Sequence, residues 1–399
     1  MICVNKSNCC GCTACAAICP KNAINMVPDE DGFVYPVVDE SKCVHCELCE
    51  RVCAFRNDLP PQSAKEVYAA VSRCTDVRES ASGGLFAAFA QAVLEQGGVV
   101  YGCAMEYENG QLWSRHICVT DEKELIKLKG SKYVQSDLGV TYPDVRKRLE
   151  AGQTVLFSGT PCQVAGLRGY LGKDYKTLFA IDIICHGVPS AKLFQDYIAF
   201  EEKKRNMKIQ AFRFRDKSQG WKLHGAMTLD SGKTVYFEPE ESSYYQMFLN
   251  SYTYRENCYH CPYASDHRPG DITIGDYWCV ELVHPELLKE NGGQLDHEAG
   301  ASCLIVNNLK GRQLLEEVGA GIEKWKSTYE DASKYNRQLT ASSQQKTERK
   351  SVLLLSRESY ARVDQWYRRR LRPIKVKRAI RAAIPRPVKN LVKKVLRKQ

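Results

Sequence analysis

Residues 9–20 read Cys-Cys-Gly-Cys-Thr-Ala-Cys-Ala-Ala-Ile-Cys-Pro, and residues 43–54 read Cys-Val-His-Cys-Glu-Leu-Cys-Glu-Arg-Val-Cys-Ala. Each copy has three cysteines separated by two residues and a fourth cysteine after three more. Such runs hold 4Fe–4S clusters, and the fourth cysteine of each run binds the cluster of the other run. Zinc motifs, the alternative, rarely repeat three evenly spaced cysteines plus a fourth. The spacing predicts one cluster on Cys9, Cys12, Cys15 and Cys53 and a second on Cys43, Cys46, Cys49 and Cys19.

The segment 1–57 resembles a bacterial two-cluster ferredoxin. Two positions depart from the usual pattern: Ala54 follows Cys53 where proline is common, and Cys10 is an additional thiol beside Cys9. Neither departure removes a ligand, and Cys10 is predicted to be a small apolar packing residue. The resemblance implies that the protein transfers single electrons.

Length and composition indicate a multidomain protein. The chain has 399 residues, 44% of them hydrophobic, which predicts two or three domains with a substantial core. No apolar run follows Met1, so no signal peptide is expected, and no segment approaches the apolar length of a membrane span. We therefore predict a cytoplasmic protein in which the 19 cysteines supply reduced thiols that hold metal.

Apolar strands and amphipathic helices alternate after Pro60-Pro61. A buried strand over 154–157 precedes a helix over 163–171, for example, and residues 208–237 read as strand–turn–strand. The predicted fold class is therefore an α/β (α+β mixed) core with an N-terminal ferredoxin-type domain. The predicted divisions are the ferredoxin domain at 1–57, a linker at 58–64, α/β regions at 65–150 and 151–330, a helical extension at 331–367 and a basic tail at 368–399.

Four of the remaining cysteines stand where a third metal site could form. Cys162 follows a buried strand where a helix should begin, because Pro161 suits the first helical position, and a thiolate there is stabilised by the helix dipole. Cys185 follows the next strand, at the sheet edge where ligands gather. Cys258 and Cys261 add a Cys-x-x-Cys pair. A third cluster is one reading, and a structural zinc site or plain core cysteines are the alternatives.

Five motifs in order resemble the coenzyme F(420) hydrogenase/dehydrogenase beta-subunit family. They are residues 82–84 (Ser-Gly-Gly), 130–135 (Gly-Ser-Lys-Tyr-Val-Gln), 158–163 (Ser-Gly-Thr-Pro-Cys-Gln), 184–190 (Ile-Cys-His-Gly-Val-Pro-Ser) and the Cys258–Pro262 pair followed by 271–276 (Asp-Ile-Thr-Ile-Gly-Asp). The resemblance implies a bound FAD associated with residues 65–150. It also implies one further 4Fe–4S cluster in 151–330, with Cys162, Cys185, Cys258 and Cys261 as its ligands.

The flavin residues follow from the resemblance and from local sequence. Ser82, Gly83 and Gly84 open a predicted helix whose free N–H groups could receive a pyrophosphate, although an ordinary N-cap serine with two loop glycines is the alternative. Lys132, with Tyr133 beside it, is predicted to bind a phosphate or lie near the flavin ring, and its alternative is a solvated loop lysine. The G-x-G-x-x-G fingerprint is missing, so an NAD-type site has no support.

Two histidines neighbour the predicted ligands of the third site. His186 and His260 are weak candidates for tuning that cluster or relaying a proton, and Lys132 is a third weak candidate for a catalytic role. A structural role is the alternative for each histidine.

The net charge of +10 resides in the tail. Residues 368–399 hold 14 of the 57 Lys and Arg residues and no acid, so the rest of the chain has 43 basic and 47 acidic residues. Apolar residues such as Ile380 and Ile384 recur on one helical face there, which predicts peripheral contact with an anionic membrane surface. A disordered solubilising tail or nonspecific RNA contact is the alternative, and no specific nucleic acid is expected.

These features predict an iron–sulfur flavoprotein oxidoreductase. Electrons would pass between the ferredoxin clusters, a third cluster and FAD, which acts on a small-molecule substrate. Related proteins with a fused ferredoxin suggest a setting in polysaccharide biosynthesis. The alternatives are an electron-transfer subunit that feeds a partner enzyme and has no substrate of its own, and a structural metalloprotein with zinc at the later cysteines.

Overall fold

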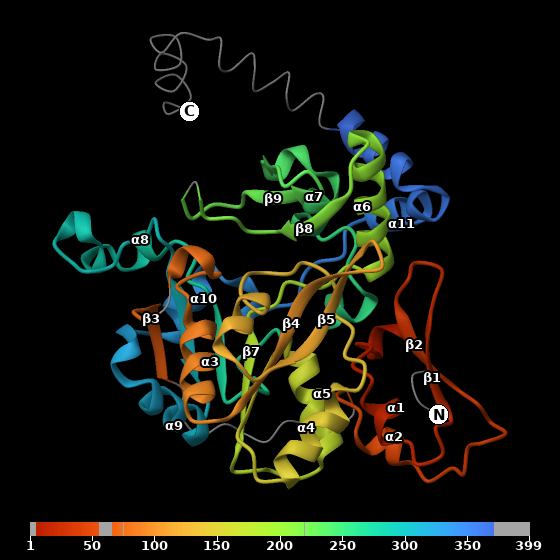
Figure 1. Cartoon of the computed structure of the whole chain (residues 1–399), viewed down its shortest axis with the longest axis horizontal. Helices are drawn as coiled ribbons and strands as arrows, with labels where there is room; N and C mark the ends of the chain where they lie inside the picture. The colour runs from red at the N-terminus through yellow and green to blue at the C-terminus, as the bar shows by residue number, and fades with distance from the viewer. Residues whose placement is uncertain (1–4, 56–65, 75, 219, 371–399) are drawn as a thin grey trace, which may run out of the picture.

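The computed structural model describes residues 5–55, 66–74, 76–218 and 220–370, and its centre is an eight-stranded mixed sheet (Figure 1). The strand order is β13-β3-β12-β11-β7-β6-β4-β5. Strands β4, β6, β7 and β11 are parallel, and the remaining pairs are antiparallel. The strands are β3 (Glu66–Ser72), β4 (Val99–Glu108), β5 (Gln111–Val119), β6 (Val155–Gly159), β7 (Leu178–Ile183), β11 (Ile272–Asp276), β12 (Ser302–Val306) and β13 (Ile322–Ser327).

The central strands are apolar throughout because both faces of the sheet are covered. In β6, Leu156 packs into the cluster with α3 and α9, whereas Val155 and Phe157 pack into the cluster with α4 and α5. This alternation is why a continuous apolar run, rather than a polar–apolar alternation, marks these strands. The helices on the faces are α3 (Leu85–Glu95), α9 (Leu309–Val318), α4 (Thr141–Glu150) and α5 (Pro161–Leu171).

The ferredoxin module lies beside α5 at one side of the sheet (Figure 1). It consists of a hairpin of β1 (Ile24–Pro28) and β2 (Val34–Val38) with short helices α1 (Ala14–Ile18) and α2 (Leu48–Arg51). The two cysteine runs have the same backbone twist, because the residues on both sides of the second cysteine have positive φ in each copy. These residues are Gly11 and Thr13 in the first copy and His45 and Glu47 in the second.

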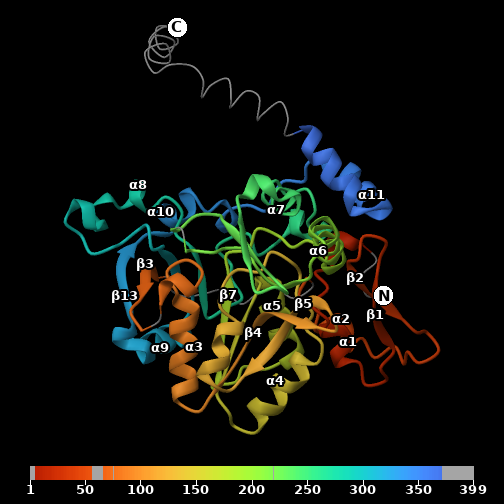
Figure 2. The same ribbon diagram turned by 45° about the horizontal axis from the view of Figure 1, so that its top comes forward.

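A second layer covers one end of the sheet. It contains a three-stranded sheet of β8 (Ile209–Arg213), β9 (Gly225–Leu229) and β10 (Thr234–Phe237), with helices α6 (Ala191–Arg205) and α7 (Ser243–Leu249). Helix α11 (Glu348–Glu358) lies near α6 and the ferredoxin hairpin (Figure 2). Its Arg357 pairs with Asp31 at the hairpin turn (Nε–Oδ1 2.7 Å), so this helix contacts the ferredoxin module.

The remaining helices are short. The α-helices are α8 (Val280–Val283) and α10 (Tyr329–Lys334), and residues 360–370 are also helical. The 3₁₀ helices are η1 (Lys6–Asn8), η2 (Val77–Glu79), η3 (Glu122–Lys127), η4 (Pro239–Glu241), η5 (Glu256–His260), η6 (Pro285–Leu287), η7 (Lys289–Asn291), η8 (Gly319–Gly321) and η9 (Arg337–Leu339).

The predicted fold class, a mixed α/β core with an N-terminal ferredoxin-type domain, is confirmed. Residues 122–127 form a 3₁₀ helix, and β4 extends to Glu108 because β5 pairs with it from Val100 to Glu108. The linker at 58–64 and the tail beyond residue 370 lie outside the described residues. Within the described residues, no helix has the length and apolar character needed to cross a membrane.

Candidate functional site

The structure divides the eight ferredoxin cysteines into the two groups that the spacing predicts. One cavity of about 170 Å³ is lined by Cys9, Cys12, Cys15 and Cys53. A second cavity of about 390 Å³ is lined by Cys19, Cys43, Cys46 and Cys49. The fourth cysteine of each run therefore faces the three cysteines of the other. We refer to these as the first and the second ferredoxin site.

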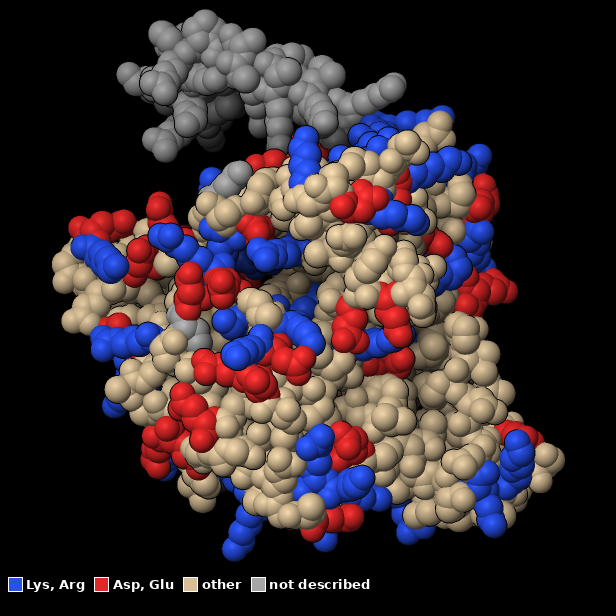
Figure 3. Space-filling model, viewed as in Figure 1, with Lys and Arg blue, Asp and Glu red and all other residues tan. Residues whose placement is uncertain are grey.

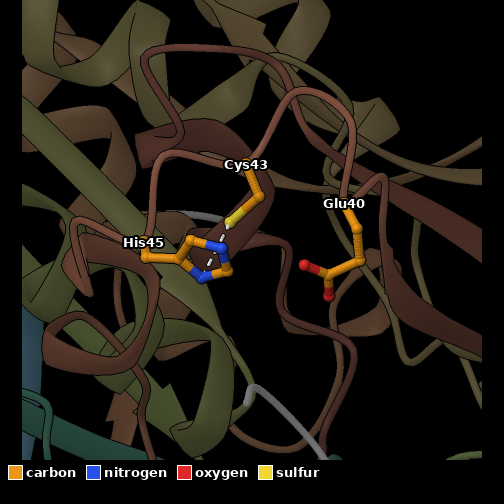
Figure 4. A group of neighbouring side chains, drawn as sticks. All are labelled: Glu40, Cys43 and His45. Carbon is orange, nitrogen blue, oxygen red and sulfur yellow. Dashed lines mark hydrogen bonds between the residues drawn. The ribbon is translucent and has the colours of Figure 1, made fainter.

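The second ferredoxin site contains a compact group of potential ligand atoms (Figure 4). The side chains of Glu40, Cys43 and His45 have ligand atoms within 4.8 Å of one another, and Cys43 Sγ lies 3.9 Å from His45 Nδ1. Cys43 is a predicted cluster ligand, and Glu40 and His45 are exposed on the same loop. The group is thus part of the wall of the second ferredoxin site.

Cys162 and Cys185 leave the central sheet at the same edge. In the parallel pairing of β6 and β7, Gly159 is level with Asp182, and each cysteine lies three residues further along the chain, beyond the end of its strand. Thr160 caps α5 together with Gln163, so that helix begins at Pro161 as predicted. A hydrogen bond with Cys10, followed by contributions from Thr160 and Arg255, lowers the pKa of Cys162 to about 7, which favours the thiolate that binds metal.

Cys258 on η5 and Cys261 directly after it lie close to Cys162 and Cys185. Burial raises the pKa of Cys185 to about 12, and negative charge on Cys162 and Cys261 adds to that increase. Burial also raises the pKa of Cys258 well above its usual value, with further contributions from Cys185 and Cys162. Four thiolates this close repel one another unless a bound cation compensates them. We refer to these four cysteines as the third site.

A buried ion pair holds the segments of the third site in place. Asp182, three residues before Cys185, accepts hydrogen bonds from Arg268 Nη2 at 2.6 Å and from Gly270 N at 2.8 Å. Arg268, seven residues after Cys261, also donates to the carbonyl oxygen of Tyr263 at 2.6 Å. Both charged groups are almost fully buried, so removing either one would take away the opposite charge that this buried pair supplies to the other.

A cavity of about 310 Å³ opens at this edge of the sheet and contacts most of the predicted site. Figure 3 shows Lys and Arg side chains around a hollow on the face seen there. The predicted site residues that line the cavity are Ser82, Gly84, Lys132, Tyr133, Cys162, Cys185 and His186, and Cys10 of the ferredoxin module lines it as well.

The three residues before α3 have different roles. Ser82 has a positive φ of 49°, and its hydroxyl donates to Asp276 Oδ1 at 2.6 Å. Gly83 packs on the sheet, where a Cβ would lie 2.5 Å from the carbonyl oxygen of Ala70, and it does not line the cavity. Gly84 is the N-cap of α3, and no side chain caps the first turn of that helix. The cavity therefore meets an uncapped helix N-terminus.

Lys132 and Tyr133 are held by the protein itself. Lys132 Nζ donates to the carbonyl oxygens of Leu128 and Lys129 at 2.8 and 2.7 Å, and burial lowers its pKa to about 8. Tyr133 stacks on Phe248 with 4.2 Å between ring centroids. Lys132 thus stabilises the loop after η3 by hydrogen-bonding its carbonyl oxygens, and it is not the solvated loop lysine of the alternative reading.

The histidines differ in position. His186 lines the cavity, whereas His260 is exposed on η5 and does not line it. His116, which sequence reasoning missed, also lines the cavity. Its Nδ1 lies 2.9 Å from Ser136 Oγ, and its Nε2 lies 3.0 Å from the carbonyl oxygen of Ser158. Burial lowers its pKa to about 4, so the ring is neutral at pH 7.

Helix α5 connects the third site to the first ferredoxin site. It begins beside Cys162, and one turn later Gly166 packs so closely on Cys12 that a Cβ would lie 2.8 Å from the Cys12 sulfur. Cys10 packs in the same apolar cluster as Cys12 and Cys162. The sequence indicated Cys10 as a packing residue but gave no sign that it lies between two metal sites.

Gln135, from the 130–135 motif, also contacts the ferredoxin module, and the sequence did not indicate this contact. Its Nε2 donates to the carbonyl oxygen of Cys10 at 3.0 Å, and its backbone N–H donates to Pro189 O at 3.0 Å. It therefore joins the ferredoxin module to the loop after Cys185.

Comparisons with known proteins match two segments of the chain. Residues 8–57 match the 4Fe-4S dicluster domain, and residues 152–329 match the family described as the C terminus of the coenzyme F(420) hydrogenase/dehydrogenase beta subunit. An uncharacterized polyferredoxin-like protein of Methanocaldococcus jannaschii is 34% identical over 70 residues, which are 15% of this chain and 42% of that protein. The match therefore spans less than half of that relative.

A solved structure of the F(420)-reducing [NiFe] hydrogenase complex from Methanosarcina barkeri contains a chain of similar structure, with a TM-score of 0.43 and 14% sequence identity. The match covers 67% of this chain and 83% of that chain. The family resemblance and the presence of a ferredoxin-type module are confirmed by the family matches. The protein is thus an iron–sulfur electron-transfer protein that contains a 4Fe-4S dicluster domain and a region, residues 152–329, related to the C terminus of the coenzyme F(420) hydrogenase/dehydrogenase beta subunit.

Proposed function

We propose that the protein is an iron–sulfur flavoprotein oxidoreductase with a third 4Fe–4S cluster and FAD in its α/β core. One observation carries the proposal: a single cavity is lined by Cys162 and Cys185 of the third site, by Ser82 and Gly84 before α3, and by Cys10 of the ferredoxin module. Metal site, candidate cofactor site and electron-transfer module therefore meet at one place.

The spacing of the thiols at the third site favours a cluster over zinc. A tetrahedral zinc ion with Zn–S bonds of about 2.3 Å holds its thiolates about 3.8 Å apart. Glu40, Cys43 and His45 are the one group of three or more potential ligand atoms within 4.8 Å of one another among the described residues, so no three sulfurs of the third site lie that close together. A cubane holds its thiolates farther apart, because each binds a different iron.

The cavity suits a flavin nucleotide where it meets the start of α3. The uncapped N-terminus of α3 offers backbone N–H groups for a phosphate. Ser80 also lines the cavity, and its Oγ is buried and has no hydrogen-bond partner among the described residues. Flavin, when bound, supplies the conversion between single electrons and two-electron chemistry. Lys132 donates to loop carbonyls, so we assign it to shaping the cavity rather than to binding phosphate.

The order of the sites suggests where an electron partner docks. Cys46 of the second ferredoxin site is exposed, whereas the first ferredoxin site contacts α5 through Cys12. An external redox protein would therefore exchange electrons at the second site, and the first site would connect to the core. A small-molecule substrate would reach the cavity directly.

Anaerobic reductive titration tests this proposal. Three clusters that take one electron each and a flavin that takes two predict about five electrons per chain. Uptake of about two electrons, with no flavin released on denaturation, would leave the ferredoxin module as the sole redox component and contradict the proposal.

The exposed Cys46 also favours a second candidate function, an electron-transfer subunit that feeds a partner enzyme. The two functions differ in whether purified protein with bound flavin oxidises or reduces a small molecule without a partner. A link to polysaccharide biosynthesis and contact with a membrane remain predictions, and both depend on a tail that lies almost entirely outside the described residues.

A further inference from the structure

Arg255 joins the ferredoxin module to the third site, and nothing in the sequence motifs marks it. We propose that Arg255 is a positioning residue for electron transfer: it fixes the first ferredoxin site against the third site and, by donating to the Cys9 sulfur, raises the reduction potential of the first cluster. The effect on the reduction potential requires only the ferredoxin clusters. The role in electron transfer to the third site rests on the proposed function.

The guanidinium of Arg255 is fully buried in the ferredoxin module. Its Nε donates to the carbonyl oxygen of Cys9 at 2.8 Å, and its Nη2 donates to Val34 O at 2.7 Å and lies 3.6 Å from Cys9 Sγ. The Arg255 guanidinium carbon lies 4.2 Å from the centre of the Tyr35 ring. The side chain thus holds both the ligand loop and the hairpin of the module.

The backbone of Arg255 belongs to the third site. Its N–H donates to the carbonyl oxygen of Val188, three residues after Cys185, at 2.9 Å. Its own carbonyl accepts from the N–H of Cys258 at 3.0 Å. A single residue therefore contacts a ligand of the first ferredoxin site with its side chain and two ligand loops of the third site with its backbone.

The charge of Arg255 requires a negative partner. Among the described residues, no carboxylate forms an ion pair with Arg255, although a buried cation is costly unless it is paired. The thiolate of Cys9 and the cluster it would hold supply that negative charge. Hydrogen bonds from charged donors are stronger than neutral ones, and donors to cluster sulfurs raise cluster potentials because they favour the more negative reduced state.

The two copies of the cysteine run differ at the position that contacts Arg255. Gly11 and His45 occupy equivalent positions, and both have positive φ. A Cβ on Gly11 would lie 3.0 Å from Arg255 Nη1, so glycine leaves room for the guanidinium. His45 is exposed in the second copy. Glycine at position 11 therefore serves both the positive-φ turn of the cysteine run and the close approach of Arg255.

The test is a redox titration of the full-length protein, followed by electron paramagnetic resonance after anaerobic purification. In Arg255→Gln, we expect unchanged iron per chain and a more negative reduction potential for one ferredoxin cluster. A tenfold change in the reduction equilibrium corresponds to a shift of about 59 mV for one electron. Arg255→Lys keeps the charge but cannot reproduce the forked contacts, so we expect a smaller shift in the same direction.

Arg349 provides a matched control. It donates to the carbonyl oxygen of Tyr254 at 3.0 Å and pairs with Glu256 at 2.9 Å, and these two residues flank Arg255 in sequence. We expect Arg349→Gln to leave both ferredoxin potentials unchanged.

Unshifted potentials in iron-replete Arg255→Gln would overturn the proposal. If that variant does not retain iron, an unshifted potential in iron-replete Arg255→Lys would do the same. Failure of the proposed function would appear separately, in the iron content and electron uptake of the unaltered protein.

Discussion

Replacing Gly166 with alanine places a methyl group in the contact between α5 and the first ferredoxin site. The new Cβ would lie 2.8 Å from Cys12 Sγ and 2.9 Å from the hydroxyl oxygen of Tyr142. In an exposed helix, the same change stabilises by about 0.8–1 kcal/mol. Inserting a methyl group into a packed contact costs about 1–3 kcal/mol. We therefore expect a net loss of about 1 kcal/mol, opposite in sign to the helix propensity.

Anaerobic urea unfolding, followed by the visible absorbance of the iron–sulfur clusters, measures this effect. A chain with several domains and clusters need not unfold in one step, so the midpoint of cluster loss is the quantity to compare. We expect a lower midpoint for Gly166→Ala and a still lower one for Gly166→Leu. Gly169→Ala is a second probe of the same helix face, because its Cβ would lie 2.4 Å from the carbonyl oxygen of Val52. A higher midpoint for Gly166→Ala would refute the close packing of α5 on Cys12.

Three further predictions concern the α/β core and its contact with the ferredoxin module. Asp182→Asn removes the charge partner of the buried Arg268, so we expect a loss of about 3–5 kcal/mol in stability and about four fewer irons per chain by iron analysis; unchanged iron would contradict this. Cys10→Ala should retain about twelve irons, whereas Cys185→Ala should lose about four, and equal losses in both would make Cys10 a ligand. Burial lowers the pKa of Lys132 from 10.5 to about 8, so between these pH values the unfolded chain binds a proton that the folded chain lacks, and stability rises with pH. Urea unfolding at pH 8 and pH 10 should show a larger rise for the unaltered protein than for Lys132→Met, and equal rises would contradict the shift.

Local sequence predicted the features that local chemistry determines. The two cysteine runs imply crossed groups because the run is too short to surround a cubane alone, and the structure groups Cys53 with the first run and Cys19 with the second. The start of α5 followed from Pro161. Cys162 and Cys185 were predicted to lie together because the ends of neighbouring parallel strands share one edge.

Contacts between distant segments could not be predicted in this way. Gly11 reads as a loop glycine and Gly166 as a helix glycine, yet each makes room for a group from another segment. Arg255 lies 246 residues from Cys9 in sequence, and no periodicity or motif relates the two. Lys132 looked free to bind phosphate because the sequence does not show which carbonyl oxygens surround its amine.

Iron and zinc content per chain, measured together after anaerobic purification, test the third cluster most directly. Three 4Fe–4S clusters predict about twelve irons and no zinc. About eight irons with one zinc would keep the ferredoxin clusters but place zinc at Cys162, Cys185, Cys258 and Cys261. That result would contradict electron transfer from the ferredoxin module through the third site into the cavity.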